Sequence, residues 1–181
     1  MKAFSYSKCR GAVACGMIWV LGTPESYGIL RCKKIAGDSG LMNKLMIFVD
    51  IEVPFHDIDA MNVVWHGHYL KYFELARCEL LRAFDYDYHQ MWESGYLWPI
   101  VECQLKYVHP ANYAQKLRVE ATLAEYENRI KIVYRIFDKD SGEKLTKGYT
   151  IQVAIDAKTK ELQFVSPEIV FKNLEKIGIL Q

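Results

Sequence analysis

The stretch FHDIDAMNVVWHGHYLKYFELAR, residues 55–77, joins a short polar loop to the start of a helix. Its residues 55–68 carry two carboxylates, Asp57 and Asp59, and three histidines, His56, His66 and His68. Apolar residues then recur at helical spacing: Tyr69, Tyr72, Phe73, Ala76, Leu80, Ala83 and Phe84. Because the first N–H groups of a helix lack intrahelical partners, they can stabilise an oxyanion beside the preceding carboxylates. An acid next to an oxyanion site is the arrangement that acyl transfer needs.

Alternating apolar and polar residues on either side of this stretch predict β-strands. Five segments alternate in this way: residues 47–55, 101–107, 117–123, 130–136 and 145–155. The turn sequence at residues 138–142 predicts a hairpin between two of them. An antiparallel sheet must cover its apolar face, and the helix after the acidic loop is the only long amphipathic element suited to do so. Periodicity alone therefore predicts an α+β fold with a helix-covered antiparallel sheet.

The chain of 181 residues divides into three unequal parts. Residues 1–41 lack sustained periodicity, and we interpret them as an extension of unknown structure that is either not native or disordered. Their apolar run, residues 11–22, follows basic residues as in a signal peptide, but it is too short to span a bilayer as a helix. We favour the unstructured extension over an export signal. Residues 46–166 are expected to form one domain, and residues 167–181 a C-terminal helix or tail.

Charge, composition and motifs argue against nucleic-acid binding, metal dependence and serine-hydrolase chemistry. A formal net charge of +1, with dispersed lysines and arginines, gives no reason to expect nucleic acid as a partner. Five cysteines without metal or redox spacing favour free thiols, so we predict a cytoplasmic protein. His66 and His68 point to different faces of a helix, and no further ligand completes a set, so no metal or other cofactor is expected. The chain also lacks the Gly-x-Ser-x-Gly elbow of serine hydrolases.

The acidic loop resembles that of the hotdog-fold acyl-CoA thioesterases that include 4-hydroxybenzoyl-CoA thioesterase and its Tol-Pal-associated relatives. The resemblance covers about residues 48–155 and rests on the acidic loop and on a second segment, residues 107–113. It implies an antiparallel sheet wrapped around one long helix, Asp59 as the catalytic carboxylate and His66 in the active site. The chain departs from the family at Met61-Asn62, where many members have glycine, although asparagine also tolerates left-handed backbone.

The resemblance leads to a specific site hypothesis. Asp59 acts either as a general base on water or as a nucleophile that forms an anhydride. His66 orients Asp59, donates to the thioester or assists the leaving thiolate. The backbone N–H groups from Val64 to Gly67, which include that of Trp65, are the oxyanion candidates.

Three further residues lie in or next to the acidic loop. Tyr69 either packs the helix or forms a wall of the acyl pocket, and packing is the simpler interpretation. Asp57 either acts on Asp59 by like-charge repulsion or is a solvated turn or N-cap residue. We expect His68 to be a surface residue.

The leading hypothesis is hydrolysis of an acyl-CoA or acyl-carrier-protein thioester to a free acid and a thiol. One alternative is a hotdog hydroxyacyl dehydratase that uses a histidine and a helix carboxylate such as Glu74. Another is a non-catalytic acyl-binding or scaffold subunit, which would have no need for Asp59. The resemblance also implies a homodimer or homotetramer. The acyl group and its carrier are not fixed by the sequence.

Overall fold

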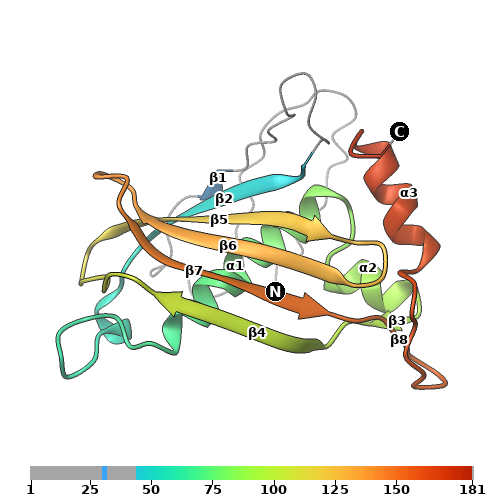
Figure 1. Cartoon of the computed structure of the whole chain (residues 1–181), viewed down its shortest axis with the longest axis horizontal. Helices are drawn as coiled ribbons and strands as arrows, with labels where there is room; N and C mark the ends of the chain where they lie inside the picture. Colours follow the sequence, from blue (N-terminus) through green and yellow to red (C-terminus); the bar gives the residue numbers. More distant parts are fainter. Residues whose placement is uncertain (1–29, 32–43, 181) are drawn as a thin grey trace, which may run out of the picture.

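The computed structural model describes Leu30–Arg31 and residues 44–180. Most of the predicted extension, residues 1–41, therefore lies outside the described residues, although Leu30–Arg31 forms a short strand, β1. In the described part of the chain, a six-stranded antiparallel sheet curls around helix α1 (His68–Ala83) (Figure 1). Its strand order is β1, β2 (Met46–Glu52), β5 (Lys116–Glu125), β6 (Ile130–Asp138), β7 (Lys144–Gln152) and β4 (Ile100–Tyr107). The predicted α+β fold is confirmed.

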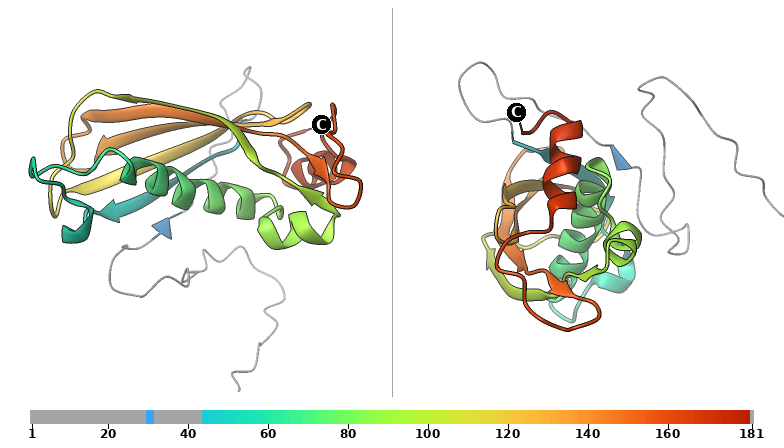
Figure 2. Two further views of the ribbon diagram at one scale, coloured as in Figure 1. Left: turned by 90° about the horizontal axis from the view of Figure 1, so that it is seen from below. Right: turned by 90° about the vertical axis from the view of Figure 1, so that its right-hand side faces the viewer.

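Helix α1 lies along the concave face of the sheet and fills it (Figure 2). Its apolar stripe is the predicted one, and Tyr72, Phe73 and Leu80 are almost completely buried. The Phe73 ring stacks on Tyr134 of β6 with centroids 4.3 Å apart. Alternate residues of the strands close the core from the other side: Ile47, Val49, Ile51, Leu117, Val119, Ala121, Ile130, Ile132 and Ile136. Each large side chain removed from water in this way contributes about 1.5–3 kcal/mol.

The smaller elements cluster at the two ends of α1. The 3-10 helix η1 (Phe55–Asp57) precedes it, and α2 (Tyr88–Glu93) follows it. A small sheet pairs β3 (Tyr96–Leu97) with β8 (Ile155–Asp156). Helix α3 (Glu168–Lys176) begins directly after Pro167, in the segment for which the sequence left a helix or a tail open. No helix of the described residues is long and apolar enough to cross a membrane.

Strand β4 differs from its sequence prediction. Its alternation predicts one buried face, but every residue of β4 except the half-buried Leu105 is exposed. The reason is its position, since β4 pairs with β7 on one side only and forms an edge of the sheet. Helix α1 packs mainly against β2 and β5, at the other side of the sheet, and it reaches β4 through the contact between the Tyr69 and Tyr107 rings, 5.2 Å apart.

Candidate active site

The acidic loop is a tight turn that carries Asp59 to one end of the molecule. The Asp59 amide donates to the Val63 carbonyl at 2.9 Å, and the Asn62 amide donates back to the Asp59 carbonyl at 3.0 Å. Asn62 has a φ of 63°, the left-handed region that glycine adopts easily. Asparagine is among the few other residues that tolerate this conformation. The departure from the family pattern at this point therefore keeps the turn.

The Asp59 side chain is half-buried, and its two oxygens differ. Oδ1 accepts the Met61 amide at 2.8 Å, which ties the carboxylate to its own turn. Oδ2 accepts no hydrogen bond from any residue that the structure describes. One oxygen thus fixes the orientation of the group, while the other is available to water or to a substrate.

Two of the predicted oxyanion donors are already used by the fold. The Val64 amide donates to the Ala111 carbonyl at 2.8 Å, and the Trp65 amide donates to the Asp57 carbonyl at 2.9 Å. These two amides are therefore not free to bind an oxyanion in this structure, and the prediction that they do so has no support from it. In contrast, the amides of His66 and Gly67 donate to no residue within the described ranges. The first helical amide, that of His68, is also occupied, because it donates to the Trp65 carbonyl.

Trp65 and His66 enclose the start of α1. Their rings lie 4.8 Å apart, and both side chains are exposed. A Cβ atom added to Gly67 would overlap the Trp65 ring, so the glycine lets the indole lie directly on the helix start. The structure shows no hydrogen bond between the side chains of His66 and Asp59, so the idea that His66 orients Asp59 stays a prediction.

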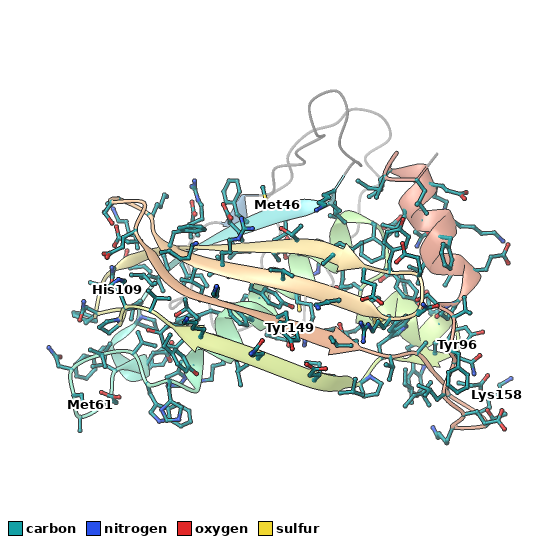
Figure 3. The ribbon with its side chains drawn as sticks, viewed as in Figure 1. Met46, Met61, Tyr96, His109, Tyr149 and Lys158 are labelled. Atoms are coloured by element: carbon teal, nitrogen blue, oxygen red, sulfur yellow. The ribbon has the colours of Figure 1, made fainter. Side chains whose placement is uncertain are left out.

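The second segment of the resemblance, residues 107–113, lies against the acidic loop. The Tyr107 hydroxyl donates to the His66 carbonyl at 3.0 Å, and the Ala111 amide donates to the Tyr69 hydroxyl at 3.0 Å. Figure 3 shows Met61 and His109, which mark the two loops, at the same end of the molecule. Two segments about forty residues apart in sequence thus form one region.

Tyr69 is buried at the centre of this region, as the packing interpretation predicts. Burial raises the pKa of its hydroxyl, the charges of Tyr107 and Asp59 raise this pKa further, and the Ala111 hydrogen bond opposes the shift. Its hydroxyl therefore stays protonated at neutral pH, and it joins the two loops by accepting the Ala111 amide.

Of the two interpretations of Asp57, the solvated turn or N-cap residue is wrong. It is completely buried, not solvated, and the Tyr72 hydroxyl donates to its Oδ2 at 2.8 Å. His68, expected at the surface, is only 15% exposed in its side chain, and its Nδ1 lies 3.4 Å from Asp57 Oδ1. The available signal was the spacing of His68 and Tyr72, because residues four apart share one helix face.

Glu74, the carboxylate of the dehydratase alternative, has other partners. It forms an ion pair with Arg77, and the Tyr88 hydroxyl donates to its Oε1 at 2.6 Å. Arg77 is only 5% exposed, and it also donates to Tyr88 at 2.9 Å. A buried cation needs such a partner, so this carboxylate is committed to compensating Arg77.

Comparison with known proteins adds an independent line of evidence. The sequence profile of the Thioesterase-like superfamily matches residues 53–172. The Bacillus subtilis protein YneP, provisionally named an acyl-CoA thioesterase, is 30% identical over 118 residues, which are 64% of this chain and 84% of YneP. The DHNA-CoA thioesterase of Staphylococcus aureus is 27% identical with a TM-score of 0.60, over 65% of this chain and 78% of that one. A Thermus thermophilus protein of undescribed activity is 27% identical with a TM-score of 0.63, over 71% and 97% of the two chains.

Proposed function

Because the chain belongs to the Thioesterase-like superfamily, we propose that its acidic loop hydrolyses acyl-CoA thioesters with Asp59 as the reacting carboxylate. The names of its relatives, an acyl-CoA thioesterase and a CoA-ester thioesterase, support thioester hydrolysis. The observation that carries the assignment to Asp59 is its Oδ2, which has no partner among the described residues, on the loop that leads to the His66 and Gly67 amides, which likewise have none there. These amides polarise the thioester carbonyl and stabilise the oxyanion.

The reaction then follows one of two routes. Asp59 takes a proton from water, which attacks the carbonyl carbon, or Asp59 attacks that carbon itself to form an anhydride that water opens. In both routes the C–S bond breaks, the thiolate leaves and takes up a proton, and the free acid is released.

The acyl group and the subfamily belong to the proposal as well. The sequence of the acidic loop supports membership of the subfamily of 4-hydroxybenzoyl-CoA and Tol-Pal-associated thioesterases. The Staphylococcus aureus relative, in contrast, is named for another CoA ester. We favour CoA over an acyl carrier protein as the carrier of the acyl group, because the names of YneP and of the Staphylococcus aureus enzyme both specify CoA esters. A cytoplasmic location is supported by the free thiols of Cys78 and Cys103, since reducing compartments keep thiols unpaired.

The alternatives have less support. A dehydratase needs a helix carboxylate that is free to react, and Glu74 is paired with Arg77. A non-catalytic scaffold does not need a carboxylate oriented through one oxygen with the other left open, which is the state of Asp59.

The purified protein is expected to release free thiol from acyl-CoA. The measurement is continuous thiol detection over a panel of short, medium and long aliphatic acyl-CoAs, benzoyl- and hydroxybenzoyl-CoA, and the matching acyl carrier proteins. Turnover on at least one CoA ester, abolished by heat denaturation, is the expected result. A folded protein that is inert on the whole panel would remove the enzyme proposal.

We also propose that the protein is a homodimer or a tetramer built from dimers. Strand β4 supports this, because it is an eight-residue edge strand that exposes Val101, Cys103 and Tyr107, and no strand of the described residues pairs with its outer side. Long exposed edges can pair with another chain, and the register shift of β4 lies at its first residues, between Ile100 and Glu102, so the strand from Glu102 to Tyr107 pairs with β7 without interruption. The edge begins beside Trp98 and ends at Tyr107, which holds the His66 carbonyl, so a second subunit there would lie near the site.

Val101→Lys is expected to convert the assembly to monomers, since it places a charge on the proposed interface. Light scattering after size-exclusion chromatography gives the mass. Phe164→Lys is the matched control, because Phe164 is 82% exposed and lies outside β4, in the segment after β8. A monomeric wild type, or a Val101→Lys assembly of unchanged mass, would contradict the proposed interface.

A further inference from the structure

The hydrolysis described above makes no use of the buried carboxylate of Asp57. The carboxylate lies under the acidic loop, and the Tyr72 hydroxyl donates to its Oδ2 at 2.8 Å. On its other side, His68 Nδ1 lies 3.4 Å and the exposed His56 Nε2 lies 3.7 Å from Oδ1. No lysine or arginine of the described residues forms an ion pair with it. Two imidazoles and one phenol therefore surround a carboxylate that has no contact with solvent.

Two atoms of this cluster have unmet hydrogen-bonding capacity. Asp57 Oδ1 and His68 Nδ1 are both buried, and neither has a hydrogen-bond partner in the described structure. Buried polar atoms without a partner are uncommon, because each costs free energy. The two atoms face each other at 3.4 Å, so a small movement joins them in a charge-assisted hydrogen bond. This bond would connect the Asp57 side chain to His68, the first residue of α1.

The backbone of Asp57 adds a second attachment to the same turn. Its carbonyl accepts the Trp65 amide at 2.9 Å, while its side chain faces His68. The two residues between these attachment points are His66 and Gly67, whose amides are the unpartnered ones. Asp57 thus holds both flanks of the candidate oxyanion donors and lies two residues before the reacting carboxylate.

We infer that Asp57 is a positioning residue of the thioesterase, which with His68 and Tyr72 sets the amides of His66 and Gly67 against Asp59. The inference rests on the proposed function. Donors that are fixed before the reaction stabilise the developing charge without having to reorganise. A displacement of about 1 Å at such a site can cost about 10²-fold in rate. Asp57 acts through its neighbours and does not touch the thioester.

The test compares two tyrosines that are equally buried. Tyr72→Phe removes the hydroxyl that donates to Asp57, and Tyr134→Phe removes one that is bonded to Thr150 in the core, at 2.9 Å. Both variants lose one buried hydroxyl and keep the ring. We expect Tyr72→Phe and Asp57→Asn to lower kcat by about 10- to 100-fold, with KM within about twofold. Tyr134→Phe should lower the melting temperature about as much as Tyr72→Phe does. It should leave kcat within about twofold of the wild-type value.

A second measurement separates this inference from the proposed function. In amide NMR spectra, Asp57→Asn and Tyr72→Phe should shift or broaden the His66 and Gly67 resonances, and Tyr134→Phe should not. An inert wild type that shows these changes would overturn the hydrolase but keep the positioning role. An active wild type whose kcat and resonances respond no more to Asp57→Asn and Tyr72→Phe than to Tyr134→Phe would overturn the positioning role. If Tyr72→Phe does not fold, Asp57→Asn and His68→Gln decide the same comparison.

Discussion

Asp59→Asn should lower kcat for thioester hydrolysis by about 10²–10⁴-fold, the usual contribution of a positioned acid or base. Asparagine has the size of aspartate, and its side-chain oxygen can still accept the Met61 amide that Oδ1 accepts at 2.8 Å. The turn is therefore kept. The position of the reacting Oδ2 is taken by an amide nitrogen, which neither accepts a proton at neutral pH nor attacks a carbonyl. Steady-state kinetics on the best CoA ester measure the loss.

Asp140→Asn serves as the matched control for this substitution. Asp140 is exposed in the turn between β6 and β7, so the same chemical change there should leave both turnover and thermal unfolding unaltered. A single-turnover reaction in ¹⁸O-water then separates the two routes, because the anhydride route can place isotope in the Asp59 carboxylate. If Asp59→Asn retains nearly normal turnover, the reacting group lies elsewhere and the site has to be reassigned.

Local sequence patterns predicted the strands, the long helix and the acidic turn because each depends on neighbours in the chain. The alternation at residues 117–123 and 130–136 places apolar side chains on one face whatever the partner strand is. Strand β4 shows the limit of this reasoning. Its alternation is equally regular, but its exposure is decided by its place at the sheet edge, and strand order is not a local property.

The site was predicted in part for the same reason. That Asp59 precedes the helix follows from the sequence, and the turn bonds of Asp59 and Asn62 lie within a few residues. Which amides remain free does not follow, since the Val64 amide is taken by Ala111, more than forty residues away. The burial of Asp57 likewise depends on a tyrosine fifteen residues along the chain. Residue types fix the possible chemistry of a loop, and long-range packing selects which of its groups remain available.

Gly148→Ala should destabilise the fold by about 3 kcal/mol, the upper part of the range for an overpacked core. Gly148 lies in the middle of β7, opposite Leu105 of β4, where the sheet passes over the Phe73 ring. An added Cβ would overlap the Gln104 carbonyl oxygen and lie 2.9 Å from Phe73 Cε2. The first obstacle is backbone, so it cannot be relieved by a rotamer change, and the pairing of β4 with β7 has to shift.

Gly142→Ala separates this clash from the general cost of replacing glycine. Gly142 has a φ of +75° and open space around its Cβ position, so the same methyl group should cost about 1–2 kcal/mol through backbone strain alone. Chemical denaturation gives both free energies of unfolding. Since β4 also carries the proposed subunit contact and the tyrosine that holds the His66 carbonyl, Gly148→Ala should weaken the assembly and turnover as well, whereas Gly142→Ala should change neither. Equal free-energy losses in the two variants would mean that the β4 backbone moves away from the added methyl group at Gln104 at little cost. A strand that moves so easily could not hold the start of α1 in place through Tyr107 and the His66 carbonyl.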